Sequence, residues 1–80
     1  MANTFWDEEQ TVGEIKKNDR GEVIAIKLVS KNKRRFVDIR NFYVNKDGEL
    51  APGKGIAVPF DLAEDVAAQV MEAVRFADGE

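Results

Sequence analysis

Two similar turn sequences constrain the fold of this chain more than any other feature. Asn18-Asp19-Arg20-Gly21 and Asn45-Lys46-Asp47-Gly48 each begin with asparagine, end with glycine and are followed by glutamate. Asparagine and aspartate side chains hydrogen-bond to their own backbone, and glycine accepts a positive φ, so each sequence predicts a tight turn. Such turns join adjacent antiparallel strands, and the chain is therefore predicted to contain β-hairpins.

The segments beside these turns have the composition of strands. Residues 22–29 are rich in Val, Ile and Leu, and residues 35–44 alternate between two partly apolar faces. An antiparallel sheet in a small monomer normally has one polar face, so a second apolar face indicates a partner chain, a ligand or both. Weaker patterns predict a strand at 10–17, a compact basic loop at 30–34, a tight loop at 51–55 and a short strand at 56–58.

Apolar residues change to helical spacing after residue 60 and form a stripe from Leu62 to Ala77. Asp61 with Glu64 predicts a capping-box start, and Gly79 predicts the end of the helix. The predicted fold is α+β in the order β-β-β-β-α, with one domain at residues 10–78. The preceding residues 1–9 are predicted to form an acidic tail that docks through Phe5 and Trp6.

The residue types that are missing exclude several functions. The 80-residue chain has no cysteine and no histidine, which excludes disulfides, zinc–thiolate sites and cysteine nucleophiles and removes the commonest general base. Its carboxylates have no recognisable catalytic spacing, so we expect no enzyme activity, no cofactor and no metal. No apolar run approaches the roughly 18 residues of a membrane span, and the N-terminus lacks a signal peptide's features. We therefore expect an intracellular, soluble protein.

The charges are arranged in three blocks, although the net charge is only −3. Residues 1–15 carry −4, residues 16–54 carry +6 and residues 55–80 carry −5. A local basic surface determines phosphate affinity more than net charge does, so the middle block indicates a nucleic-acid partner. The competing interpretation is a solvated surface of mixed charge.

Arg40 precedes two aromatic residues, Phe42 and Tyr43, and this combination suits unpaired bases. Aromatic rings stack on bases, and arginine adds charge and cation–π contact. The alternative is that both rings belong to the core; regular alternation places Tyr43 with Val37 and Ile39, and a bulge near Asn41 would be needed to bring Arg40 and Tyr43 to one surface. Asp38 is expected to pair with Arg40, Arg35 or another strand base in a partly exposed ion pair.

The segments Phe36-Val37-Asp38-Ile39-Arg40-Asn41-Phe42-Tyr43, Asp47-Gly48-Glu49-Leu50 and Pro52-Gly53-Lys54-Gly55-Ile56 follow one another in this order. This pattern resembles the single-stranded-DNA-binding C-terminal domain of the transcriptional coactivator positive cofactor four, over roughly residues 10–77. The resemblance implies a curved four-stranded antiparallel sheet with a C-terminal helix, dimerised through the helix and sheet. It also implies channels that hold single strands.

The resemblance assigns roles to particular residues. The family's arginine that contacts nucleic acid corresponds to Arg40, and the aromatic that stacks on bases corresponds to Tyr43, where the family usually has tryptophan. The implied nucleic-acid-binding residues are Lys31, Lys33, Arg34, Arg35, Arg40, Phe42, Tyr43 and Lys54. The family often has a further aromatic in the hairpin before the third strand, whereas this chain has Lys31-Asn32-Lys33 there. The Ser- and Lys-rich arm of eukaryotic members is missing, which favours a stand-alone bacterial or phage-type member.

These observations predict a homodimeric, sequence-tolerant single-stranded DNA-binding protein that acts as a transcriptional coactivator or regulator, or in DNA maintenance. The helix stripe and two-sided strands exceed what one 80-residue core can cover, which predicts a dimer interface at Leu62, Val66, Val70 and Val74. The alternatives are a single-stranded RNA-binding regulator and a protein-interaction module of the same fold. For a bacterial chain, the expected location is the cytoplasm, in association with the nucleoid.

Overall fold

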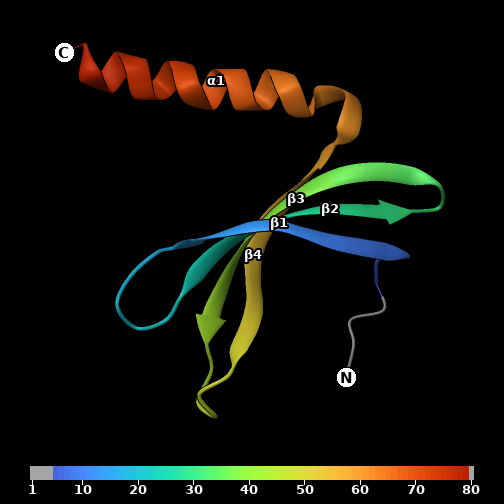
Figure 1. The fold of residues 1–80 in the computed structure, drawn as a ribbon, viewed down its shortest axis with the longest axis vertical. Helices are drawn as coiled ribbons and strands as arrows, with labels where there is room; N and C mark the ends of the chain where they lie inside the picture. The colour runs from blue at the N-terminus through green and yellow to red at the C-terminus, as the bar shows by residue number, and fades with distance from the viewer. Residues whose placement is uncertain (1–4, 80) are drawn as a thin grey trace.

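The computed structural model describes residues 5–79, which form one antiparallel sheet followed by one helix (Figure 1). The sheet order is β1-β2-β3-β4, so every strand pairs with its neighbour in sequence. The predicted β-β-β-β-α order is confirmed, whereas residues 1–4 of the predicted tail lie outside the described residues. The elements are β1 Glu8–Lys16, β2 Val23–Lys31, β3 Arg34–Val44, β4 Leu50–Pro59 and α1 Phe60–Asp78.

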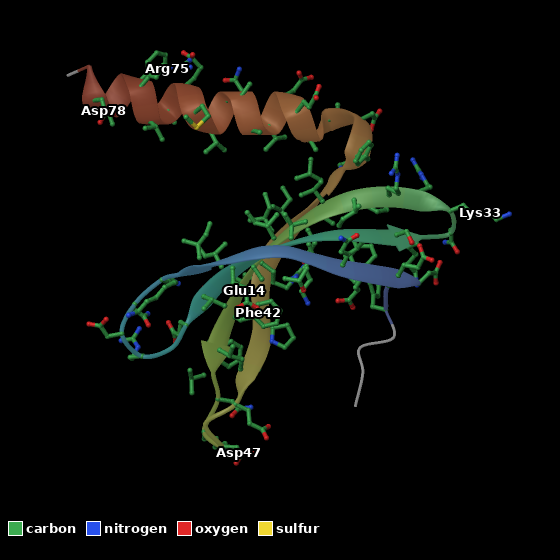
Figure 2. All side chains as sticks on the ribbon, viewed as in Figure 1. Glu14, Lys33, Phe42, Asp47, Arg75 and Asp78 are labelled. Atoms are coloured by element: carbon green, nitrogen blue, oxygen red, sulfur yellow. The ribbon has the colours of Figure 1, made fainter. Side chains whose placement is uncertain are left out.

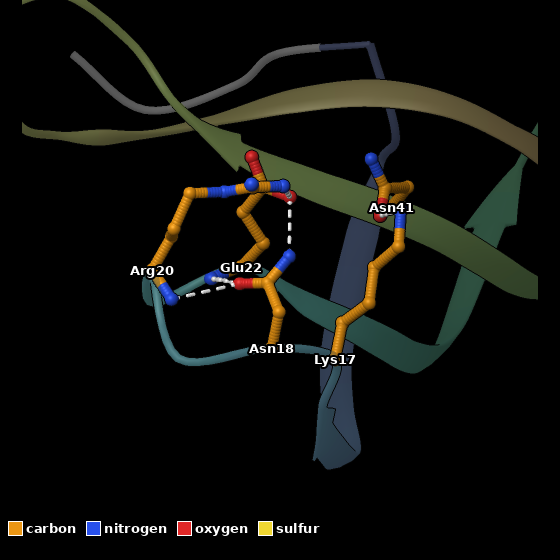
Figure 3. A network of polar contacts seen from close by, with 5 residues as sticks. All are labelled: Lys17, Asn18, Arg20, Glu22 and Asn41. Atoms are coloured by element: carbon orange, nitrogen blue, oxygen red, sulfur yellow. Dashed lines mark hydrogen bonds and ion pairs between the residues drawn. The ribbon is translucent and has the colours of Figure 1, made fainter.

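The turn between β1 and β2 is held by the side chain of Asn18 (Figure 3). Asn18 Oδ1 accepts hydrogen bonds from the backbone N–H of Arg20 (2.9 Å) and of Glu22 (3.4 Å), and Asn18 Nδ2 donates to Glu22 Oε1 (2.8 Å). Gly21 has a φ of 96°, as the turn prediction requires. Hydrogen bonds from Asn18 and Arg20 lower the pKa of Glu22 below its ordinary value of 4.5. The first predicted turn is therefore confirmed: Asn18 supplies its hydrogen bonds and Gly21 its positive φ.

The turn between β3 and β4 repeats this geometry. Asn45 Oδ1 accepts hydrogen bonds from the backbone N–H of Asp47 (2.9 Å) and of Glu49 (3.0 Å). Gly48 has a φ of 81°. Both turns predicted from the Asn and Gly positions are thus confirmed, with the same side-chain mechanism.

The connection between β2 and β3 is shorter than predicted. The strands pair as far as Lys31 and Arg34, so only Asn32 and Lys33 form the turn, and the predicted five-residue loop at 30–34 is wrong. Asn32 and Lys33 have φ values of 53° and 67°, which is the two-residue hairpin geometry that matches strand twist. Pairing of β2 with β3 thus stabilises Lys33 at a positive φ, a backbone conformation that favours glycine.

The predicted loop at residues 51–55 is instead part of β4. Arg40 pairs with Gly55 and Phe42 pairs with Pro52, so Gly53 and Lys54 both lie opposite Asn41 in a bulge. Pro52 is tolerated because β4 is an edge strand. A Cβ at Gly55 would lie 2.5 Å from the backbone oxygen of Ile39. This glycine therefore permits close approach by the backbone of β3.

The helix α1 begins at Phe60, after Pro59, and its first turn has no side-chain cap. The predicted capping box at Asp61 and Glu64 is wrong, because the helix has already begun before Asp61. The predicted end is confirmed: the N–H of Gly79 donates to the carbonyl of Arg75 (2.9 Å). No helix within residues 5–79 is both long and apolar enough to cross a lipid bilayer.

The core of the described chain is small. Ala25, Val29 and Val58 are the buried apolar residues, and none of the described residues of α1 is buried. The helix projects along one side of the twisted sheet and approaches it beside β3 and β4 (Figure 1). The apolar stripe of α1 and the sheet face beneath it therefore remain largely open to solvent in one copy of the chain.

Candidate nucleic-acid interface

The two faces of β3 carry different chemistry. Pairing between β2 and β3 is unbroken from Val23↔Phe42 to Lys31↔Arg34, so side chains alternate regularly between the faces. The face toward α1 is apolar and includes Ile26, Val37, Ile39 and Val58, which line a groove with the helix. The opposite face, here called the aromatic–basic face, carries Lys27, Lys31, Arg34, Phe36, Arg40 and Phe42.

Arg40 on the aromatic–basic face is fixed by a buried carboxylate. Arg40 Nε and Nη2 donate to the two oxygens of Asp38 at 3.1 and 2.9 Å, and Arg40 Nη1 donates to the carbonyl of Gly53 at 2.9 Å. The hydrogen bonds to Asp38 raise the pKa of Arg40. The predicted pairing with Asp38 is confirmed. Because Asp38 is only 3% exposed, breaking this pair costs more folding free energy than breaking a surface pair.

Phe42 shares one cleft with two cations of this face, Lys27 and Arg40. The cleft is lined by Trp6, Glu9, Lys27, Asp38, Arg40, Phe42 and Pro52. Lys27 Nζ lies 5.1 Å from the centroid of the Phe42 ring and 3.2 Å from Glu9 Oε1. A ring, an ammonium and a guanidinium are therefore within reach of one ligand, as base stacking combined with phosphate binding requires.

Tyr43 lies on the face opposite Arg40. A bulge in β3 near Asn41 would have brought Arg40 and Tyr43 to one surface, but the bulge is in β4. The alternation of β3 is therefore intact, and the side chains of Arg40 and Tyr43 do not share a face. Tyr43 is 43% exposed. A Cβ at Gly53 would lie 3.3 Å from Tyr43 Cδ1, which places the ring over the edge strand. Arg40 and Tyr43 thus approach the same backbone position from opposite sides.

The other predicted cations are distributed around the sheet. Lys33 is at the tip of the β2–β3 hairpin, far from the β3–β4 turn that carries Asp47 (Figure 2). Arg35 is on the helix side, with its guanidinium carbon 4.1 Å from the centroid of the Phe60 ring. Lys54 is exposed in the β4 bulge. The structure therefore brings Lys31, Arg34, Arg40 and Phe42 to one face, with Lys33 and Lys54 at its margins.

Lys27 of this face was not predicted, and Trp6 was predicted only as part of a docking tail, without a position on the sheet. Trp6 lies 5.6 Å, centroid to centroid, from Phe36 and lines the cleft of Arg40 and Phe42. Lys27 pairs with Asp38 in the strand register, which places it beside Arg40. The register implied by the β2–β3 hairpin was the signal that would have located Lys27, whereas no sequence pattern indicated where Trp6 docks.

The residues predicted for a dimer interface form an open apolar surface. Leu62, Val66, Val70 and Val74 are all exposed in the isolated chain, and Val70 is 56% exposed. Val66 and Val70 line both the groove against the sheet and a second apolar groove along the helix. Within residues 5–79 there is no cluster of Asp, Glu, His or Cys arranged to hold a metal ion.

Comparison with known proteins agrees with the fold and the motif. The family model described as "Transcriptional Coactivator p15 (PC4)" matches residues 18–68, more than half of the chain. The chain belongs to this family. The match spans the two Asn–Gly turns, the Asp38–Tyr43 motif and the β4 bulge, and so includes Arg40 and Phe42 of the aromatic–basic face.

A bacterial member of this family has a closely similar fold. The orthorhombic crystal structure of BPSL1147, a PC4 homolog from Burkholderia pseudomallei K96243, has 27% sequence identity and a TM-score of 0.74, covering 90% of this chain and 97% of that one. Its tetragonal crystal form has 26% identity and a TM-score of 0.74, covering 84% and 98%. A search of curated proteins finds no match to this sequence. This chain is therefore similar to a bacterial PC4 homolog in both sequence and fold.

Proposed function

We propose that this protein is a homodimeric, sequence-tolerant single-stranded DNA-binding protein that acts in transcription regulation or DNA maintenance. The observation that carries the proposal is the cleft in which the Phe42 ring lies beside Lys27 and Arg40. Single-strand binders combine a positive groove for the backbone with rings on which bases stack. Membership of the coactivator family supports a role in transcription.

Each candidate residue has a separate proposed role. Phe42 stacks on a base from the aromatic–basic face, and Tyr43 provides a second ring at the edge of the sheet. Lys31, Lys33, Arg34 and Lys54 surround these rings and neutralise phosphates, with Arg35 beside the helix. Arg40 is held by Asp38 and Gly53, so it presents its remaining N–H groups in a fixed orientation.

The second copy in the proposed homodimer covers the apolar stripe of α1. Leu62, Val66, Val70 and Val74 form a continuous exposed row, and the sheet face beside them is also apolar. An exposed surface of this kind normally meets a partner. Pairing two copies through these faces leaves the two aromatic–basic faces free for nucleic acid.

Fluorescence anisotropy with single-stranded DNA, duplex DNA and single-stranded RNA of equal length tests the proposal across a salt series. We expect the single strand to bind more tightly than the duplex, because stacking needs unpaired bases. If roughly five phosphates are neutralised, the slope of log K against log salt lies between about −3 and −4. Duplex binding as tight as single-strand binding contradicts the proposal, and tighter binding to RNA than to DNA changes the assigned substrate.

A further inference from the structure

The segment before and at the start of β1, residues 5–9, contains two aromatic and three acidic residues in succession. It is here called the N-terminal arm. The family match begins at residue 18, so the arm lies outside the part of the chain that the family model describes. The arm is nevertheless docked on the aromatic–basic face by several specific contacts.

The polar groups of the arm engage the cations and a backbone donor of that face. Glu9 Oε1 lies 3.2 Å from Lys27 Nζ, and the carbonyl of Phe5 accepts a hydrogen bond from Lys31 Nζ at 2.7 Å. Asp7 Oδ2 accepts a hydrogen bond from the backbone N–H of Asn32 in the hairpin at 2.8 Å. Oxygens of the arm thus engage Lys31, which is proposed to bind phosphate, and Lys27, which lies in the cleft of Phe42.

The rings of the arm contact one ring and one cation of the aromatic–basic face. Trp6 packs against Phe36 at 5.6 Å and lines the same cleft as Arg40, Phe42 and Pro52. The centroid of the Phe5 ring lies 4.7 Å from the centroid of the Trp6 ring and 4.5 Å from Lys31 Nζ. The arm thus presents planar rings and anionic oxygens in the combination by which a single strand would be bound.

We infer that the N-terminal arm is an intramolecular occupant of the aromatic–basic face and competes with single-stranded nucleic acid for it. This inference rests on the proposed function. Nucleic acid binds only after the arm leaves Lys27, Lys31 and the Phe42 cleft, so the measured affinity is lower than the affinity of the open face. Weakening the arm therefore increases affinity without any change in the face itself.

The first test compares two full-length double variants that change the net charge equally. Asp7→Asn with Glu9→Gln weakens the arm, whereas Asp19→Asn with Asp47→Asn removes two acids in the exposed turns. Anisotropy with oligo-dT should show binding about three- to tenfold tighter for the arm variant than for the turn variant, as expected for loss of exposed charge contacts. Equal affinity of the two variants overturns the inference.

The second test uses Trp6, the only tryptophan in the chain, as a reporter. Oligo-dT should shift Trp6 emission to longer wavelength and increase its quenching by acrylamide, because the ring leaves the sheet. Trp6→Ala should also bind oligo-dT more tightly. If Trp6 becomes protected on binding and Trp6→Ala binds more weakly, Trp6 is itself a stacking residue and competition is wrong.

The two proposals fail in distinguishable ways. Tight oligo-dT binding that is equal in the original chain and both double variants retains the proposed function and removes the competition. Absence of oligo-dT binding in all three proteins contradicts the proposed function, and the competition fails with it. Both proposals are supported only if the arm variant gains more affinity for oligo-dT than the turn variant does and Trp6 is released on binding.

Discussion

The side chains of Arg40 and Tyr43 project from opposite faces of β3, yet both lie close to Gly53 in the edge strand β4. The guanidinium of Arg40 donates to the Gly53 carbonyl at 2.9 Å, and a Cβ at Gly53 would lie 3.3 Å from Tyr43 Cδ1. Lys54 follows directly in the same bulge. A cation, a ring and a lysine therefore converge on one sheet edge, and a single strand crossing this edge could contact all three.

Arg40→Ala should destabilise the fold, because it leaves the buried carboxylate of Asp38 without the two hydrogen bonds that Arg40 donates. We expect a loss of about 1–3 kcal/mol in the free energy of unfolding, the usual cost of an unsatisfied buried group. Chemical denaturation of Arg40→Ala, Asp38→Ala and the double variant measures it. The double variant should lose less than the sum of the single losses, and strict additivity would show that the pair is not coupled.

Tyr43→Ala should weaken binding to single-stranded DNA by about 1–3 kcal/mol with little change in the salt slope, because it removes a ring rather than a charge. Tyr43→Trp is the matched control and should retain or improve binding, since it keeps a stacking surface. Anisotropy over a salt series is paired with thermal melting. If Tyr43→Ala melts much earlier while its folded fraction binds normally, the ring is structural.

Gly55→Ala should destabilise the sheet by about 1–3 kcal/mol, the usual range for overpacking, because the added Cβ would lie 2.5 Å from the Ile39 oxygen and 2.8 Å from Arg40 Cα. Gly13→Ala is the control, since a Cβ there has no neighbour within 4 Å. Thermal melting of the two variants should separate them clearly. Equal melting temperatures would show that β3 and β4 can move apart at Gly55 without loss of stability.

Val70→Asp should dissociate the proposed homodimer or unfold the chain, because it places an unpaired charge in the apolar stripe. Ala68→Asp introduces the same side chain on another side of the helix and should leave the dimer intact. Sedimentation velocity, with circular dichroism to measure folding, distinguishes these results. A monomeric original chain, or equal behaviour of the two variants, argues against this interface.

Local sequence patterns predicted the fold because each acts over a few residues. The Asn18 and Asn45 turns have the same side-chain hydrogen bonds, and the stripe after residue 60 forms the expected helix. The β4 bulge was missed because Pro52, Gly53 and Gly55 are typical of loops. Pairing with β3 decided the outcome there, and a pairing partner distant in sequence is invisible to a local pattern.

The candidate site was less predictable than the fold. Alternation correctly placed Arg40 with Phe42 and Tyr43 with Ile39, because the register of β3 is regular. Docking of Trp6 on Phe36 depends on the path of a segment with no periodicity, so no sequence rule located it. Asp38 is likewise buried in a cleft that Trp6 and Pro52 also line, and composition does not reveal these neighbours.

We propose that single-stranded DNA binds to the aromatic–basic face and its β4 edge. Titration of the isotope-labelled chain with oligo-dT, followed by amide chemical shifts in two-dimensional NMR, tests it most directly. We predict the largest shift changes at Lys27, Arg40, Phe42 and Lys54, with small changes along the apolar stripe of α1. Changes confined to α1, or no changes at oligo-dT concentrations that saturate the anisotropy signal, would contradict the claim.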